Sequence, residues 1–200
     1  MIDKKGSVPN TAELKDGKWV RTWKYNKWQS MLRRCFDNKC KEKHPTYKDV
    51  TCCDRWLCFA NFLEDLEILK QEYNWDENET LNLDKDILNK NNKIYSLENC
   101  VLVPDWINNL FTKRDNDRGS YPIGVSYDKQ NKKYQTHCNV NGKLISLGLY
   151  STIKEAFNAY KQAKEQEIKR VANECVLKGY ITQDSRLYKA MMGYQIKIDD

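Results

Sequence analysis

Basic residues are concentrated between residues 113 and 150, where lysines and arginines number seven and aspartates three. Lysine ammonium groups in such a stretch can neutralise nucleic-acid phosphates. Glutamine and histidine side chains between them can donate to or accept from base edges. The side chains that could make such contacts are those of Lys129, Lys132, Lys133, Gln135, His137 and Lys143, and lysines that are merely solvated on a small sheet-and-helix domain are the alternative.

The whole composition is compatible with this chemistry. Lysine and arginine number 34 against 28 aspartates and glutamates, a net charge of +6 that favours a polyanionic partner. Six tryptophans, twelve tyrosines and five phenylalanines indicate packed cores rather than disorder. No apolar run approaches the roughly 20 residues of a membrane span, and residues 1–10 do not resemble a signal peptide. We expect a cytoplasmic protein with no membrane partner, whose eight cysteines stay reduced.

Helical periodicity marks two stretches of the N-terminal half. Residues 19–36 predict a helix with an aromatic face, and Arg33 and Arg34 suit the negative end of its dipole. Residues 56–73 predict a second helix with Asp54 as its N-cap.

A strand, a polar loop, a second strand and a helix are expected in the thirty residues that follow. Residues 81–86 alternate apolar and polar side chains, as in a strand. A short apolar run at 101–103 predicts a second strand ended by Pro104, and residues 104–111 predict a helix.

The C-terminal part predicts a small sheet and one long helix. Strands are expected at 124–127, 134–140 and 143–150, with the Asn141-Gly142 pair as a hairpin turn between the last two. The periodic stretch 152–178 predicts the helix, and a last short helix is expected near residues 187–194.

The central segment "LNLDKDILNKNNKIYSLENCVLVPDWINNLF" resembles the core of HNH endonucleases, a β-hairpin and a helix around one divalent ion. The resemblance implies that Asp84 and Asn108 are ligands of Mg²⁺ or a similar ion, and that Asn99 is the central asparagine of the motif. Lys85 then occupies the position of the general-base histidine. A register shifted by one residue instead places Asp84 at the histidine position and Leu83 at the ligand position.

Neither register supplies a histidine, and the chain's two histidines, His44 and His137, are distant in sequence. Neutral imidazole is the usual proton acceptor in phosphodiester hydrolysis. A metal ion can generate hydroxide by itself, whereas a protonated Lys85 is better suited to anchoring a phosphate. The implied catalytic set, Asp84, Lys85, Asn99 and Asn108, is therefore degenerate.

Three cysteine contexts extend the resemblance to bacterial and phage HNH-like proteins. These are Cys35 in "RRCF", Cys53 in "YKDVTCCDRWLCFANFLEDL" and Cys100 in "SLENC". Zinc is one possible occupant, with Cys40 or His44 as a fourth ligand. Zinc sites commonly use close pairs such as C-x₂-C, which no two cysteines form here, so buried free thiols are the favoured interpretation.

The segment "YPIGVSYDKQNKKYQTHCNVNGKLISLGLYSTIKEAFNAYKQAKE" resembles an AP2-type DNA-binding domain. In that family the sheet enters the major groove and the helix packs behind it. Together the two resemblances imply an α+β protein of phage or mobile-element type, acting inside a phage-infected bacterium. Its expected parts are an HNH-like (ββα-metal) domain with flanking helices at residues 1–115, a linker at 116–122, an AP2-like three-stranded antiparallel sheet packed on one long helix at 123–178, and a tail at 179–200.

Three functions remain open at this point. The first is a homing-type endonuclease or nickase that binds double-stranded DNA and uses a divalent metal ion. The second is a non-catalytic DNA-binding repressor or interference protein derived from such an enzyme. The third is a protein-binding inhibitor of host defence.

Overall fold

The computed structural model describes residues 11–112 and 120–199, and the chain divides into two compact units with a boundary between Asn108 and Asn109. We call them unit 1 and unit 2 and describe each by itself. Both contain helices and short, mostly antiparallel strands, which confirms the expected α+β class. The linker expected at 116–122 lies mostly outside the described residues.

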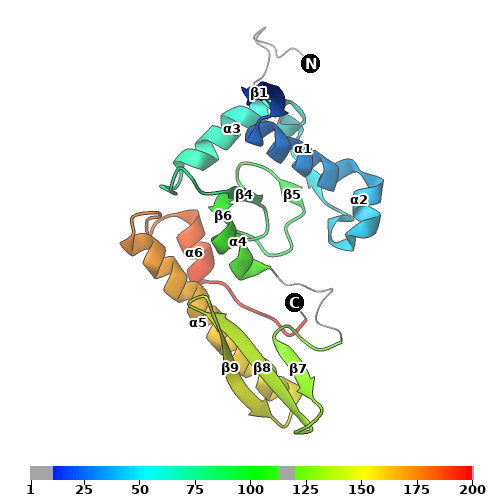
Figure 1. The fold of residues 1–200 in the computed structure, drawn as a ribbon, viewed down its shortest axis with the longest axis vertical. Helices are drawn as coiled ribbons and strands as arrows, with labels where there is room; N and C mark the ends of the chain where they lie inside the picture. Colours follow the sequence, from blue (N-terminus) through cyan, green and yellow to red (C-terminus); the bar gives the residue numbers. More distant parts are fainter. Residues whose placement is uncertain (1–10, 113–119, 200) are drawn as a thin grey trace. The chain divides into compact units, whose positions relative to one another are not determined.

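Unit 1 combines two longer helices, α1 and α3, with two short ones, short strands and turns. Its elements are β1 (Ala12–Lys15), β2 (Lys18–Arg21), α1 (Trp23–Phe36), α2 (Asn38–Lys43), η1 (Pro45–Tyr47), β3 (Thr51–Cys52), η2 (Asp54–Leu57), α3 (Phe59–Gln71), β4 (Leu81–Asp84), β5 (Ile94–Tyr95), β6 (Val101–Pro104) and α4 (Asp105–Phe111), the last crossing the boundary (Figure 1). The core of the unit is built mainly from α1, η2, α3 and β6. Its largest fully buried side chains include Met31, Trp56, Phe62, Leu66 and Leu102.

The expected start of the first helix is wrong, because residues 12–21 form the β1–β2 hairpin. The hairpin turns at Asp16 and Gly17, both with positive φ, and Asp-Gly is a favoured pair for a two-residue turn. Helix α1 begins at Trp23, after Thr22 accepts a hydrogen bond from the backbone N–H of Tyr25 as N-cap. Trp19, expected on the helix, lies on β2 and is 75% exposed.

The start of the second expected helix is also wrong. Residues Asp54–Leu57 form the 3₁₀ turn η2, and α3 begins only at Phe59. Asp54 is the first residue inside η2, and its N-cap is Cys53. Trp56 holds the turn in place: its indole N–H donates to Asp65 at 2.7 Å, and its carbonyl accepts from the indole of Trp28 at 2.8 Å.

Strands β4 and β6 form an antiparallel pair followed at once by helix α4. Strand β4 ends at Asp84, two residues earlier than expected, and β6 includes Pro104, which was expected to end it. The connection between them contains β5, which pairs in parallel with β3 and was not foreseen. This connectivity brings the C-terminal end of β4 near the face of α4 that carries Asn108.

Unit 2 has the expected sheet and long helix. Its elements are β7 (Val125–Asp128), β8 (Lys133–Val140), β9 (Lys143–Tyr150), α5 (Ile153–Leu177) and α6 (Arg186–Met192). The strands form an antiparallel sheet in the order β7-β8-β9, and α5 packs along one face of it (Figure 1). The turn between β8 and β9 is at Asn141 and Gly142, both with positive φ, as the sequence predicted.

Helix α5 is tied to the sheet by a capped start and a closely packed face. Thr152 and Glu155 form a capping box at its N-terminus. Further along, Phe157 and Tyr160 are buried with Val125 and Cys138 of the sheet. The segment after α5, expected as a tail with a short helix, contains α6 and contributes Ile196 to this core.

Candidate functional site

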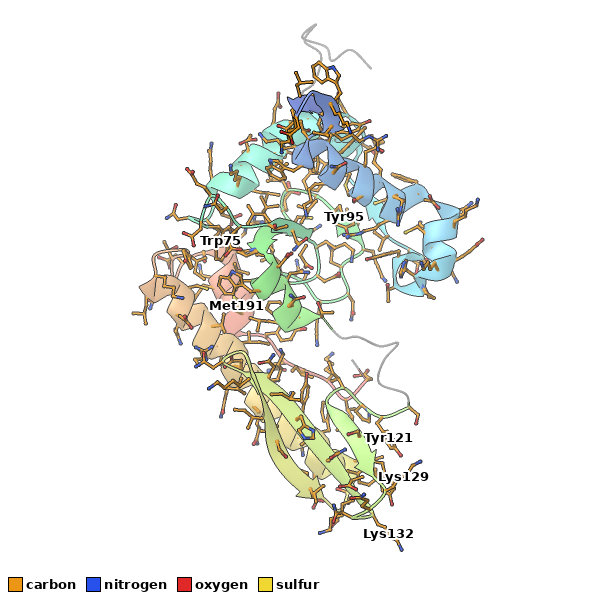
Figure 2. The ribbon with its side chains drawn as sticks, in the orientation of Figure 1. Trp75, Tyr95, Tyr121, Lys129, Lys132 and Met191 are labelled. Carbon is orange, nitrogen blue, oxygen red and sulfur yellow. The ribbon has the colours of Figure 1, made fainter. Side chains whose placement is uncertain are left out.

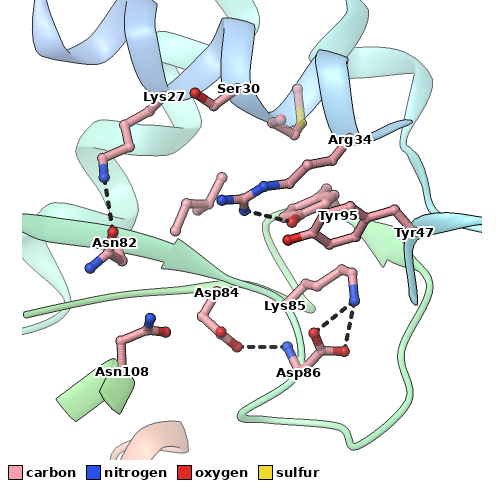
Figure 3. A pocket seen from close by; sticks show the side chains of 12 residues that line it. Lys27, Ser30, Arg34, Tyr47, Asn82, Asp84, Lys85, Asp86, Tyr95 and Asn108 are labelled. Atoms are coloured by element: carbon pink, nitrogen blue, oxygen red, sulfur yellow. Dashed lines mark hydrogen bonds and ion pairs between the residues drawn. The ribbon is translucent and has the colours of Figure 1, made fainter. Parts of the chain in front are cut away.

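A polar pocket of about 200 Å³ in unit 1 is the place where side chains of opposite charge meet. Helix α1 supplies one wall through Lys27, Ser30 and Arg34, which recur at helical spacing and so share a face. The opposite wall comes from β4, the residues after it and α4 (Figure 3). Two tyrosines, Tyr47 and Tyr95, line the same space.

The structure brings three of the four expected catalytic residues to this pocket. Asp84, Lys85 and Asn108 line it, although they come from the end of β4 and from α4. Asn99 does not line it; its backbone N–H donates to the Ser96 hydroxyl at 3.4 Å, in the turn before β6. The register with Asp84 and Asn108 as neighbours across the pocket is therefore compatible with the fold, whereas Asn99 takes no part in it.

Lys85 occupies the position where the general base was expected, and it is committed to other contacts. Its side chain is buried, and Nζ donates to both carboxylate oxygens of Asp86 at 2.7 and 2.8 Å and to the carbonyl of Asn92 at 2.8 Å. An ammonium group that donates to three acceptors cannot accept a proton from water. Lys85 is thus a structural cation that closes the loop after β4.

Asp84 has one carboxylate oxygen in use. Oδ1 accepts hydrogen bonds from the backbone N–H groups of Asp86 and Ile87, at 2.7 and 2.8 Å, which fixes the turn that follows β4. Burial raises the pKa of Asp84, and these two hydrogen bonds oppose that effect only in part. The pocket thus disfavours a negative charge on this side chain.

Arg34 and Lys27 are the functional candidates that the sequence did not reveal. The Arg34 guanidinium donates through Nη1 to the Tyr95 hydroxyl at 3.0 Å and lies 5.6 Å from the centre of the Tyr47 ring. Lys27 donates to Asn82 Oδ1 at 3.1 Å (Figure 3). In the sequence, the position of Arg34 is explained by the negative end of the helix dipole. Only the spacing of residues 27, 30 and 34 indicates that they share one face of α1.

These residues fit a divalent metal ion poorly. Of the two carboxylates in the pocket, Asp86 is paired with Lys85 and Asp84 offers one oxygen that is not hydrogen-bonded to the turn. Mg²⁺ usually binds through carboxylates and water, and the cations Lys27 and Arg34 repel it. Across residues 11–112 and 120–199, no group of three or more His, Cys, Asp or Glu side chains is placed to hold a metal ion.

The cysteines proposed for zinc do not form such a group either. Cys35 hydrogen-bonds with Cys52, which was outside the proposed set, and burial raises its pKa to about 12. Burial also raises the pKa of Cys100. Cys35, Cys53 and Cys100 therefore do not come together as a metal-binding set in the part of the chain that the structure describes.

The second candidate surface is the face of the unit 2 sheet opposite α5, here called the outer face. Tyr134, Cys138 and Val140 of β8 pack toward the helix, so the alternate residues Gln135, His137 and Asn139 lie on the outer face. The register places Leu149 beside Gln135, Ser146 beside His137 and Leu144 beside Asn139. Leu144 is 74% exposed.

The expected lysines lie around this face but not all on it. Lys129 and Lys132 belong to the β7–β8 turn, at the tip of the sheet in Figure 2, and Lys133 starts β8. The turn is fixed because Asp128 accepts hydrogen bonds from the backbone of Gln130 and Asn131 and from the Asn131 amide. Lys143 pairs with Val140 and so projects to the helix side of the hairpin end.

Comparisons of the chain with protein-family models, with curated proteins and with solved structures found no match. Among the described residues, no helix is long and apolar enough to cross a membrane. The assignment of function therefore depends on the geometry of the pocket and of the outer face.

Proposed function

We propose that this chain is a non-catalytic DNA-binding protein whose outer face, on the β7-β8-β9 sheet, lies in the major groove of duplex DNA. The observation that carries the proposal is the separation of the sheet into two faces. One face packs on α5, while the other presents Gln135, His137 and Asn139, with the lysines of the β7–β8 turn at one end of β8 and the exposed Leu144 at the other. The AP2-like and HNH-like assignments belong to this proposal.

Each group on the outer face has a matching group on DNA. Gln135 and Asn139 can pair with the edge of adenine, and the exposed Leu144 can contact a thymine methyl group. Lys129, Lys132 and Lys133 can neutralise phosphates at the groove edge, because the Asp128 turn holds them together. The major groove, about 12 Å wide, accepts a β-ribbon of this kind.

The test measures duplex binding by the full chain over a series of salt concentrations. Replacing Lys129, Lys132 and Lys133 together with Gln should weaken binding on every sequence and reduce the salt dependence by about 0.9 per lost phosphate contact. The control replaces three exposed lysines of α5 and α6, Lys154, Lys169 and Lys189, with Gln. Equal effects of the two triple variants would overturn the assignment of the outer face.

Metal-dependent cleavage stays a prediction, favoured by one observation: Asp84 and Asn108 line the same pocket after a hairpin-and-helix connection. Two observations oppose cleavage. Lys85 is hydrogen-bonded to Asp86 and Asn92 and so cannot act as the general base, and the cations Lys27 and Arg34 line the pocket. A plasmid-nicking assay with Mg²⁺ and Mn²⁺ decides the matter. Cleavage that Asp84→Ala or Asn108→Ala abolishes, in folded protein, would establish a nuclease and displace the non-catalytic proposal.

A further inference from the structure

We infer that the unit 1 pocket binds a phosphate group without a metal ion, through the Arg34 guanidinium and the Lys27 ammonium. The inference does not rest on DNA binding by the outer face. It rests on the donors that the two side chains keep available, on the charge of the pocket and on its size.

Arg34 has most of its hydrogen-bonding capacity unused. Within the described residues, its guanidinium makes one hydrogen bond, to the Tyr95 hydroxyl, and no ion pair. A guanidinium carries five N–H donors in a planar fork that matches two oxygens of a phosphate. Figure 3 shows this group extended across the pocket from α1, with its end toward the space between Lys27 and Asp84.

Lys27 adds a second set of donors to the same wall. Its ammonium makes one hydrogen bond, to Asn82, and no ion pair among the described residues. Burial, and next to it the nearby Arg34 charge, lower the pKa of Lys27, while the Asp105 charge opposes them. Two like charges held in a partly buried site are unfavourable by themselves, and a bound anion relieves that repulsion.

The acids of the pocket do not supply that anion. Asp86 is neutralised by Lys85 at 2.7 Å, so Lys27 and Arg34 are opposed within the lining by Asp84, and from outside it by Asp105, whose charge acts on Lys27. The lining therefore holds three cations, Lys27, Arg34 and Lys85, against two acids, Asp84 and Asp86, and this excess also explains why its residues fit a divalent cation poorly.

Size and the remaining polar groups select the class of anion. A space of about 200 Å³ holds a single tetrahedral group with a short substituent, below the range of drug-sized ligands. The hydroxyls of Ser30 and Tyr47 line it as additional donors. A phosphate group, whether free or within a nucleic-acid backbone, combines the charge, the size and the acceptors that these donors require.

The experiment uses the full chain in the presence of a chelator, at constant ionic strength. In one arm, calorimetric titration with inorganic phosphate compares the unchanged chain with Arg34→Gln. In the other arm, the same two proteins are titrated with duplex DNA. The matched control is Arg33→Gln, the same charge change on the adjacent, exposed residue of α1.

We expect Arg34→Gln to weaken phosphate binding by roughly ten- to a hundredfold, as loss of a charged hydrogen bond does, and Arg33→Gln to leave it unchanged. A parallel loss in the DNA arm identifies backbone phosphate as the source, and a loss in the phosphate arm alone identifies the free ion. The Lys129/Lys132/Lys133 variant should bind inorganic phosphate normally, so failure of the outer-face proposal stays distinguishable.

Lys27→Gln, with Lys39→Gln as its control, repeats the test if Arg34→Gln does not fold. The inference is overturned if the Arg34 and Lys27 variants bind as their controls do. It is equally overturned if the unchanged chain binds neither inorganic phosphate nor, through Arg34, DNA.

Discussion

The Lys85 ammonium group is buried, with 5% of the side chain exposed. The Asp86 carboxylate, the Asn92 carbonyl and the face of the Tyr95 ring, 5.8 Å away, compensate for the lost hydration. The Asn92 amide in turn donates to the carbonyls of Lys85 and Ile94, so the loop from β4 to β5 closes on itself. This is the reason the position suits a lysine and not a proton acceptor.

Removing the partner of this buried charge should therefore be costly. We expect Asp86→Ala to destabilise the chain by about 1–3 kcal/mol, because the Lys85 ammonium loses two of its three acceptors. Lys85→Met combined with Asp86→Ala should recover much of that loss, since no buried charge then remains. Urea denaturation of the two single variants and the double variant measures the coupling, and additive effects would contradict a direct pair.

The candidate site was predictable only in part. Asp84 and Asn108 were named because the central segment resembles the HNH core, in which a strand acid and a helical asparagine hold one ion. Arg34 was not found, because a cation near the C-terminal end of a helix has an ordinary explanation in the helix dipole, and Lys27 was not found because a lysine within a helix is usually solvated. Only the structure shows that both line one pocket, where Lys27 also donates to Asn82 of β4.

At the scale of elements, the β8–β9 turn is fastened to α5 by a single buried carboxylate. Glu167 accepts from the Asn141 backbone N–H at 2.8 Å and pairs with Arg170 at 2.7 Å, with its side chain 5% exposed. The hydrogen bond from Arg170 is the main cause that lowers the pKa of Glu167. The hairpin is thus oriented by a contact made 26 residues away along the chain.

This contact predicts an acid-sensitive stability. Because the folded pKa of Glu167 is below the ordinary value of 4.5, its contribution is present above that value and is lost as pH falls through the folded pKa. We expect Glu167→Gln to cost about 1–3 kcal/mol at neutral pH and to flatten the decline in acid. The control is Glu174→Gln, which shares Arg170 but is 40% exposed and should matter less. Thermal melts from pH 3 to 7 compare the two, and identical profiles would contradict the assignment.

A glycine sets the distance between β7 and α5. Gly124 has φ of +78°, and a Cβ added there would overlap the ring of Tyr160. Its carbonyl also accepts a 2.6 Å hydrogen bond from the buried Thr136 hydroxyl, so the segment has little freedom to move away. This backbone position requires glycine for space as well as for conformation.

Gly124→Ala should therefore destabilise unit 2 by more than backbone strain alone, which is roughly 1–2 kcal/mol. Gly142→Ala is the matched control, because Gly142 has a similar φ of +75° with nothing within 4 Å of an added Cβ. Denaturation of both variants separates overlap from strain. Equal losses would mean that Tyr160 moves aside without cost.

Helices and strands were predicted accurately from the sequence where they are long and where capping or turn residues mark their ends. Helix α5, with a capping box and a long apolar stripe, and the β8–β9 hairpin, with Asn-Gly at its turn, were predicted correctly. The two-residue bridge of β3 with β5 was missed, since two residues show no periodicity. The β1–β2 hairpin was missed because Trp19 happened to continue the helical spacing of α1, although Asp16-Gly17 marked a turn.

At the scale of the whole molecule, each unit has a core of its own. Unit 1 is centred on Trp56, Phe62 and Leu66, and unit 2 on Phe157, Tyr160 and Cys138. The two proposed phosphate-binding features fall in different units, the pocket in unit 1 and the outer face in unit 2. A net charge of +6 favours approach of a polyanion to either.

Unit 2 provides the last prediction, since its folding should depend on the residues after α5. Ile196 is 4% exposed in the core with Phe157 and Tyr160, its N–H donates to Glu165 at 2.8 Å, and its carbonyl accepts from Lys161 at 2.7 Å. We expect residues 109–200, expressed alone, to fold and bind duplex DNA with steep salt dependence.

A fragment that ends at residue 178 keeps the sheet and α5 but loses α6 as well as the segment that carries Ile196. Exposing the Ile196 site and two hydrogen-bonding partners on α5 should lower the stability of that fragment by about 2–5 kcal/mol, a large part of what a small domain has. Circular dichroism melts of the two fragments measure the difference. Ile196→Ala in the longer fragment should reproduce part of the loss, because it removes the apolar contact and leaves both backbone hydrogen bonds. Equal melting of the 109–178 and 109–200 fragments would show that the segment after α5 is dispensable for the fold that carries the outer face.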